Sequence, residues 1–208
     1  MLENCRVIAG ATPLPVTADL ENGYGGTPRE VAETIAAAWR AGAVGGSIED
    51  GTADRRAPVY EFGLAVERVA AAAEAARALP GPFVLTARAE NFLYGIRDLD
   101  DTIRRLQAFA AAGADVLYAP GLYTLDEMRA VVSSVDRPVN VVMGLADPSI
   151  TLAQLTEVGV RRVSIGGALS RLALRSFLDG AQEMLGGRFG FLRDMAPIDS
   201  LHSAFPRS

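Results

Sequence analysis

Pro15-Val16-Thr17-Ala18-Asp19-Leu20-Glu21-Asn22-Gly23-Tyr24-Gly25 is the stretch around which the fold of this 208-residue chain is organised. Its apolar run ends on two acids, Asp19 and Glu21, and a glycine-rich turn follows at once. Residues two apart in an extended strand point to the same side, so the two carboxylates share a side at the strand's end. Such carboxylates need a cation or hydrogen bonds when buried, and their hard oxygens suit Mg²⁺ or Mn²⁺. An ordinary solvated strand end is the alternative that this stretch alone leaves open.

The bulk composition favours one globular domain and argues against a general nucleic-acid binder. Half of the residues are hydrophobic, 22% are charged, and the formal net charge is −5. This length supports one domain with a sizeable core, or at most two small ones, and an acidic chain lacks the basic face that nucleic acid requires. We expect the arginine pairs to be solvated surface charges; they are Arg55-Arg56, Arg104-Arg105 and Arg161-Arg162.

Cysteine, histidine and hydropathy exclude further classes of site. Cys5 is the only cysteine, which excludes an intrachain disulfide and a cysteine-based zinc site and fits a reducing cytoplasm. His202 is the only histidine, which argues against a histidine triad or a multi-histidine metal site. The first residues do not resemble a signal peptide, and no apolar run reaches membrane-spanning length. We therefore expect a cytoplasmic protein with neither a membrane nor a nucleic-acid partner.

Short apolar strands alternate with amphipathic or alanine-rich helices along the chain. We expect strands at about 15–20, 44–48, 83–87, 115–119, 138–143 and 162–165. Capping boxes predict helix starts at Thr27 and Thr124, and Asp147-Pro148 is expected to open the helix that ends at Gly159. We also expect a helix stub at 2–10, a long helix to about 185, and a helical tail at about 186–208 with a short helix near 189–195.

This alternation predicts an α/β fold with a parallel sheet. Polar residues gather where the strands end, as in barrels of the TIM type, and no glycine-rich dinucleotide or phosphate loop is present. We therefore favour a single (β/α) barrel domain over residues 1–208, although about six strands are counted where a closed barrel of this class has eight.

Three segments together resemble the isocitrate lyase/phosphoenolpyruvate mutase superfamily. They are 17–25, 42–50 and 86–92, and a weaker match follows at 111–115. The resemblance covers about residues 12–180. It implies a (β/α)₈ TIM-type barrel with Mg²⁺ at the carboxyl ends of the strands. It also implies action on small α-oxycarboxylates through enolate-type intermediates, by cleavage or rearrangement of a C–C or P–C bond.

The resemblance also implies roles for individual residues. Asp19 matches the direct metal ligand, while Glu21 and Glu49 match acids that hold the metal's waters. Arg88 matches the arginine that binds the substrate carboxylate, for which a bidentate fork is suited.

Two further residues are candidates with an open alternative. Tyr24 is expected to offer its hydroxyl to the reacting oxygen or to donate a proton, and packing within the turn is the alternative. Asn91 is a candidate polar contact to the substrate. Asp50 is expected to be a structural partner rather than a ligand.

The loop after the second strand departs from the lyases of this superfamily. Those lyases carry a Lys-x-Cys-Gly-His segment there, whereas the loop at 52–58 contains neither cysteine nor histidine. The loop is nearer to the mutase, decarboxylase and hydrolase branches, which we group as phosphonomutase-like. Arg55 or Arg56 is a candidate contact for an anionic substrate group, with a solvated loop charge as the alternative.

The superfamily's first two strand–helix units have no counterpart before Pro15. Three explanations are open: a start that lies upstream of the given one, completion of the barrel by a partner, or a relic with a metal site and little catalysis; we favour the first or the third. The leading functional hypothesis is a Mg²⁺-dependent enzyme. A catalytically silent binding or assembly module is the alternative, and an unrelated metal-dependent aldolase is a distant third. Alanine-rich helices and open sheet edges predict a homo-oligomer, a dimer or a tetramer.

Overall fold

The computed structural model describes residues 1–52 and 54–204. The chain divides into two compact units, Met1–Ser164 and Ile165–Ser208. The strands are β1 (Thr17–Asp19), β2 (Gly45–Glu49), β3 (Val84–Arg88), β4 (Val116–Tyr118), β5 (Val139–Val142) and β6 (Arg162–Ser164). The α-helices of the first unit are α1 (Leu2–Gly10), α2 (Pro28–Arg40), α3 (Phe62–Arg77), α4 (Leu99–Ala112), α5 (Leu125–Ser133) and α6 (Leu152–Glu157). A 3₁₀ turn, η1 (Met143–Leu145), follows β5.

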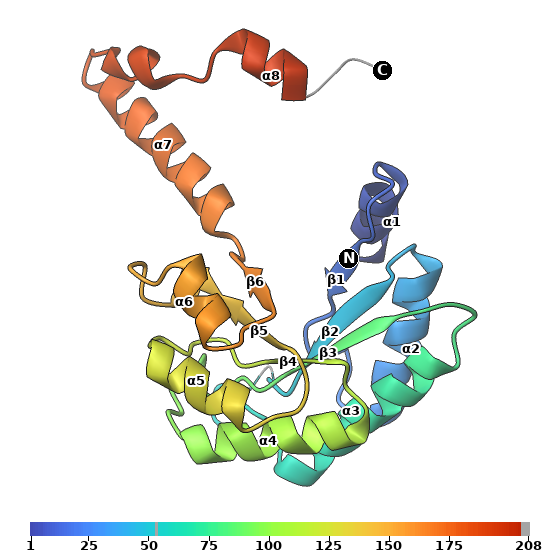
Figure 1. Ribbon diagram of the computed structural model, residues 1–208. Helices are drawn as coiled ribbons and strands as arrows, with labels where there is room; N and C mark the ends of the chain where they lie inside the picture. The colour runs from blue at the N-terminus through green and yellow to red at the C-terminus, as the bar shows by residue number, and fades with distance from the viewer. Residues whose placement is uncertain (53, 205–208) are drawn as a thin grey trace. The chain divides into compact units, whose positions relative to one another are not determined.

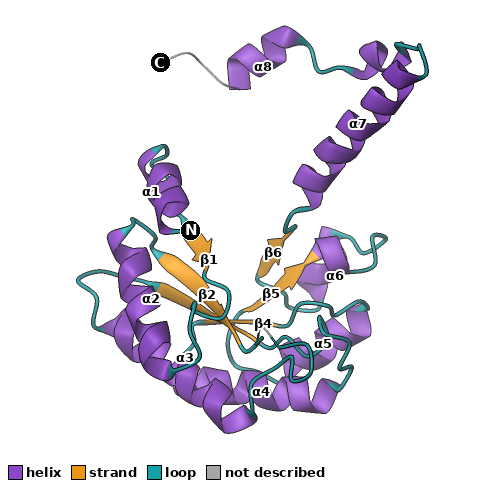
Figure 2. Cartoon of the chain, turned by 180° about the vertical axis from the view of Figure 1, so that it is seen from behind, coloured by secondary structure: helices purple, strands orange, loops and turns teal. Residues whose placement is uncertain are grey.

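The six strands form one parallel sheet in sequence order, β1-β2-β3-β4-β5-β6. The sheet is curled, with α2 to α6 following its outer side (Figures 1 and 2). The curl brings the two edge strands toward each other, since the Arg162 guanidinium of β6 donates to the Thr17 hydroxyl of β1 at 3.4 Å. The predicted α/β fold of the TIM-barrel type, lacking some strand–helix units, is therefore confirmed.

The core lies between the sheet and the surrounding helices. Ile35 of α2, Phe109 of α4, Leu117 of β4 and Met128 of α5 have no exposed surface. The middle strands are buried along most of their length, as expected when both faces of a parallel sheet are covered. This core fixes the strands, so their carboxyl ends meet at one edge of the sheet.

The sequence pattern located two of the three helix starts that were predicted from capping residues. The capping boxes at Thr27 and Thr124 are both present and begin α2 and α5. The prediction that Asp147-Pro148 opens a helix was wrong. Asp147 instead accepts hydrogen bonds from the backbone and hydroxyl of Ser149, which is a local turn. A capping box between Thr151 and Gln154 begins α6 four residues later.

The second unit contains α7 (Ala168–Leu185), a 3₁₀ turn η2 (Gly190–Asp194) and α8 (Ile198–Ala204). The short helix expected near 189–195 is present as η2, whereas α8 was not predicted. This compact unit begins at Ile165. The expected single barrel domain with a helical tail at about 186–208 remains a prediction. No helix in the described ranges is long and apolar enough to cross a membrane.

Candidate functional site

The ends of β1, β2 and β3 bring three of the predicted site residues together. Asp19, Glu49 and Arg88 are the last residues of these neighbouring parallel strands. Glu49 pairs in register with Arg88. Pairing between the first two strands continues past β1, because the Glu49 amide donates to the Glu21 carbonyl at 2.9 Å. Glu21 therefore lies beside the same strand end.

Arg88 is the shared counter-ion of three acids. Its Nη1 lies 2.7 Å from Asp19 Oδ2, its Nη2 lies 3.0 Å from Glu49 Oε2, and its Nε lies 2.8 Å from Glu90 Oε1. The guanidinium also lies over the Tyr118 ring, 5.1 Å from its centre. Each of the three nitrogens thus directs one N–H to an acid, which leaves one further N–H on each of Nη1 and Nη2 for another acceptor.

The site holds more negative charge than this one arginine neutralises. Burial raises the pKa of Glu49, and the charges of Asp19, Glu21 and Asp50 raise it further, while Arg88 opposes them. The pKa of Glu90 rises to about 7, because the cost of burying its charge outweighs the attraction of Arg88. Burial works against the charge of Arg88, yet its acidic neighbours raise its pKa overall. This surplus of carboxylates is what a bound cation would relieve.

The donor chemistry fits a hydrated divalent cation. Asp19 keeps 63% of its side chain exposed, and its Oδ1 accepts from the Glu21 amide at 3.0 Å and the Ser47 hydroxyl at 3.2 Å. Within residues 1–52 and 54–204, no three or more His, Cys, Asp or Glu side chains gather as a ready metal cage. Mg²⁺ does not require such a cage, since it commonly keeps several waters and takes one or two carboxylates. The assignment of Asp19, Glu21 and Glu49 to a metal remains a prediction.

Tyr24 lies in the turn that follows these acids. It adopts a left-handed backbone conformation, with φ 55°, and its amide donates to Asn22 Oδ1 at 3.1 Å. Partial burial raises the pKa of the Tyr24 hydroxyl, and the charges of Glu21, Asp19 and Glu49 raise it further. Tyr24 is half exposed, so its hydroxyl is accessible to a bound molecule.

Asn91 is placed differently from the other candidates. It is buried, and its Nδ2 donates to Asp101 Oδ2 of α4 at 2.8 Å. Arg88 and Asn91 share no hydrogen bond among the contacts of the described residues. The proposed contact of Asn91 with a substrate therefore remains a prediction, and the geometry here shows a residue that ties the loop after β3 to α4.

Sequence reasoning missed Glu90 as a member of the site. Glu90 has no exposed surface, and its Oε2 has no hydrogen-bond partner within the part of the chain that the structure describes. The signal was present, because Arg88 and Glu90 are two residues apart and can share a side where the chain stays extended. Ser47, whose hydroxyl donates to Asp19, was also missed.

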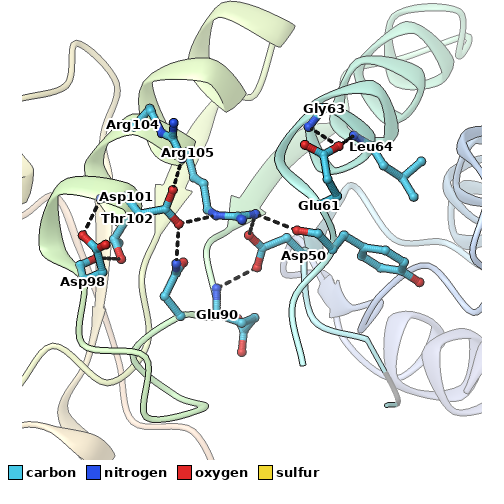
Figure 3. Close-up of polar contacts among 12 residues, drawn as sticks. Asp50, Glu61, Gly63, Leu64, Glu90, Asp98, Asp101, Thr102, Arg104 and Arg105 are labelled. Atoms are coloured by element: carbon cyan, nitrogen blue, oxygen red, sulfur yellow. Dashed lines mark hydrogen bonds and ion pairs between the residues drawn. The ribbon is translucent and has the colours of Figure 1, made fainter. Parts of the chain in front are cut away.

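The expectation that Arg104-Arg105 is solvated was wrong for Arg105. Its side chain is only 7% exposed, and it lies 3.0 Å from Asp50 Oδ2 and 2.8 Å from Asp101 Oδ2. Asp50 is confirmed as a structural partner, since its Oδ1 also accepts from the Glu90 amide at 2.8 Å (Figure 3). A buried chain of contacts thus runs from α4 through Asp50 to the backbone that carries Glu90.

The sequence matches a family model described as phosphoenolpyruvate phosphomutase over residues 1–185. The chain belongs to this family. The predicted resemblance to the phosphoenolpyruvate mutase/isocitrate lyase superfamily is thereby confirmed.

The chain is similar in sequence and structure to several members of this superfamily. The chain is 31% identical over 160 residues to "Probable 2-methylisocitrate lyase 2" of Corynebacterium glutamicum, a match covering 74% of this chain and 47% of the relative. A crystal structure from Burkholderia cenocepacia J2315, a lyase/mutase by name only, has a TM-score of 0.95 and 54% identity, covering 100% of this chain and 75% of the other. A phosphonopyruvate hydrolase complex with oxalate and Mg²⁺ has a TM-score of 0.81 and 25% identity, covering 97% and 72%. The chain spans about half the length of the curated relatives that it matches.

Proposed function

We propose that this chain carries the site of a Mg²⁺-dependent enzyme that acts on a small 2-oxo acid or related α-oxycarboxylate. The reaction class is cleavage or rearrangement of a C–C or P–C bond through an enolate-type intermediate. The observation that carries the proposal is the sharing of Arg88 by Asp19, Glu49 and Glu90 at the ends of β1 to β3. Family membership supports the same class of lyases, mutases and hydrolases.

Asp19, Glu21 and Glu49 are the residues that would hold the metal, with Asp19 as the direct ligand. When bound, Mg²⁺ supplies positive charge that stabilises an enolate oxygen. The surplus negative charge around Arg88 supports this assignment, as does the Mg²⁺ in the hydrolase complex.

Arg88 would then orient the substrate. Glu90 binds Nε from the buried side. When a metal cation binds Asp19 and Glu49, the N–H groups that these acids occupy on Nη1 and Nη2 become available to a substrate. Two adjacent N–H groups of a guanidinium match the two oxygens of a carboxylate. The oxalate bound to the hydrolase is a dicarboxylate, which supports a carboxylate as the group that is recognised.

Tyr24 would hold a proton near the reacting oxygen. A tyrosine hydroxyl is protonated at neutral pH, and the acids around Tyr24 raise its pKa further, so it can donate a hydrogen bond or a proton to an oxygen that gains negative charge. Asn91, in the loop after β3, remains a candidate polar contact to the substrate.

Turnover of a small substrate panel tests the function. With Mg²⁺ present, the consumption of phosphonopyruvate, oxaloacetate and methylisocitrate should be followed directly. Pyruvate alone is not a sufficient readout, because oxaloacetate can also be split to oxalate, the product bound in one solved relative, and a rearrangement releases no pyruvate. Asp19→Ala should abolish both turnover and the heat of Mg²⁺ binding in calorimetry. Asp126→Ala is the matched control, because Asp126 is an exposed acid of α5 that pairs only with Arg129 among the ion pairs of the described residues. Unchanged Mg²⁺ binding by Asp19→Ala would defeat the metal assignment.

A silent binding or assembly module is the second candidate. The observation that favours it is the six-stranded sheet, which leaves β1 and β6 as edge strands. Absence of turnover on the panel, combined with association through these edges, would support it. Any turnover by the 208-residue chain that Asp19→Ala abolishes would exclude it.

A further inference from the structure

Side chains from two helices donate hydrogen bonds to three carbonyl oxygens of the turn at Asn22–Gly25. The Thr34 hydroxyl of α2 donates to the Gly23 carbonyl at 2.7 Å. Arg68 of α3 donates from Nη1 to the Gly25 carbonyl at 2.8 Å and from Nη2 to the Asn22 carbonyl. Two helices therefore fix a turn that belongs to neither of them.

Arg68 is an unusual residue to find in this position. It is 1% exposed, and none of the ion pairs within the described ranges involves it. Its guanidinium stacks on the Tyr60 ring, 4.1 Å from the ring centre. It donates its hydrogen bonds to carbonyl oxygens of the turn. A buried cation without an acid partner is costly unless hydrogen bonds compensate it. Packing alone would be served better by an apolar side chain of similar volume.

The backbone has an uncommon conformation at one residue of this turn and at the residue just before it. Glu21 and Tyr24 have positive φ angles, 49° and 55°, which residues other than glycine rarely adopt. Such conformations persist only where the surroundings enforce them. Both residues belong to the site described above, one as a predicted metal-site acid and the other as the predicted proton donor.

We infer that Arg68 is a positioning residue that holds the Asn22–Gly25 turn in its strained form and so places Glu21 and Tyr24 at the metal-binding end of the sheet. The inference rests on the proposed function for its meaning, but the holding of the turn can be measured without any activity. A purely structural role would make Arg68 matter for stability alone.

Hydrogen exchange tests the holding of the turn in the metal-free protein. The amides of Glu21, Gly23 and Tyr24 are all bonded within residues 19–24. In Arg68→Met, a peptide spanning 20–26 should exchange at least tenfold faster than in the wild type, while peptides from β4 and α5 keep their rates. Unchanged exchange in 20–26 would overturn the inference.

Mg²⁺ titration tests the consequence for the site. Loss of a supporting contact behind a metal site commonly weakens metal affinity by about 10- to 100-fold, and we expect a loss in this range for Arg68→Met. Phe109→Leu, a substitution in the core of α4, is the control for lost stability and should leave Mg²⁺ affinity unchanged. Equal weakening by both variants would reduce Arg68 to a structural residue.

Two further variants keep the inference testable. If Arg68→Met does not fold, Thr34→Val removes one of the three holds with little change of shape and should speed exchange in 20–26 by a smaller factor. Unchanged exchange in that variant would then overturn the inference. If the wild type does not bind Mg²⁺, the proposed function fails, and the exchange experiment alone still decides whether Arg68 holds the turn.

Discussion

Nε of Arg88 lies 2.8 Å from Oε1 of Glu90, whose side chain has no exposed surface. This contact fixes the arginine from its buried side, whereas Asp19 and Glu49 bind its two terminal nitrogens. Glu90 therefore anchors the guanidinium, whereas Asp19 and Glu49 occupy N–H groups on its two terminal nitrogens. Keeping Glu90 in this buried position has an energetic cost that depends on pH.

Glu90→Gln should remove a pH-dependent loss of stability. The folded-state pKa of Glu90 is raised to about 7 from 4.5, so the folded state holds a proton that the unfolded state has already released. Stability from this group is present below pH 4.5 and is lost as pH rises through about 7. The glutamine variant should gain on the wild type by up to about 3 kcal/mol between pH 4.5 and 8, since each pKa unit is worth about 1.4 kcal/mol. Urea unfolding at several pH values, without divalent cations, measures this difference.

Glu67→Gln is the control for this experiment, because Glu67 is an exposed glutamate of α3. Its stability should follow the wild type at every pH. A difference between Glu90→Gln and the wild type that stays constant with pH would show that Glu90 is charged throughout this range.

Arg105→Met should destabilise the protein far more than Arg104→Met. Arg105 is 7% exposed and pairs with the buried Asp50, whereas its neighbour Arg104 is 63% exposed. Removing one partner of a buried ion pair leaves an uncompensated charge, at a cost of about 3–5 kcal/mol. Removing an exposed partner should cost no more than about 1 kcal/mol. Chemical denaturation of the two variants makes this comparison between adjacent residues.

The double variant Asp50→Asn/Arg105→Met separates pairing from packing. Because neither charge remains, it should lose less stability than the sum of its two single variants. Strict additivity would mean that Asp50 and Arg105 act independently, in spite of the 3.0 Å contact between them.

Local patterns in the sequence were sufficient for the order of the elements and for part of the site. Capping boxes at Thr27 and Thr124 are complete within four residues, so the sequence alone locates them. Asp19, Glu49 and Arg88 follow apolar runs, and a parallel sheet must bring the carboxyl ends of neighbouring strands to one edge. That geometric rule made the meeting of the three side chains predictable.

Contacts between distant residues could not be predicted in the same way. Arg105 meets Asp50 across 55 positions, and nothing in the Arg104-Arg105 pair shows which of the two faces the core. Arg68 reaches the carbonyls of Asn22 and Gly25 from a different helix, 46 and 43 residues away. These contacts follow from the packing of α3 and α4, which exists only after the chain has folded.

Gly23→Ala should disturb the turn that precedes α2. Gly23 has φ 81°, and a Cβ atom added there would lie 2.9 Å from Val31 Cγ2. Both the left-handed conformation and the close contact oppose a side chain, so we expect a loss of about 1–3 kcal/mol. Thermal unfolding measures it. Gly10→Ala is the control, since nothing lies within 4 Å of an added Cβ at the end of α1, and it should be neutral or stabilising by up to about 1 kcal/mol.

Phe177→Glu should weaken self-association of the chain. Leu174, Phe177 and Leu178 lie three and four residues apart on α7, so they share one face of the helix, and Phe177 is 70% exposed. Large exposed apolar surfaces commonly mark sites of association, which agrees with the dimer or tetramer predicted above. A charge at Phe177 would have to lose its water in such a contact, at a cost of several kcal/mol. Light scattering at micromolar concentration should therefore show an oligomer for the wild type and a smaller species for Phe177→Glu. Ala153→Glu adds the same charge to an exposed position in the first turn of α6 and should keep the wild-type mass. A monomeric wild type would refute self-association, and an unchanged mass for Phe177→Glu would exclude this face of α7 as its basis.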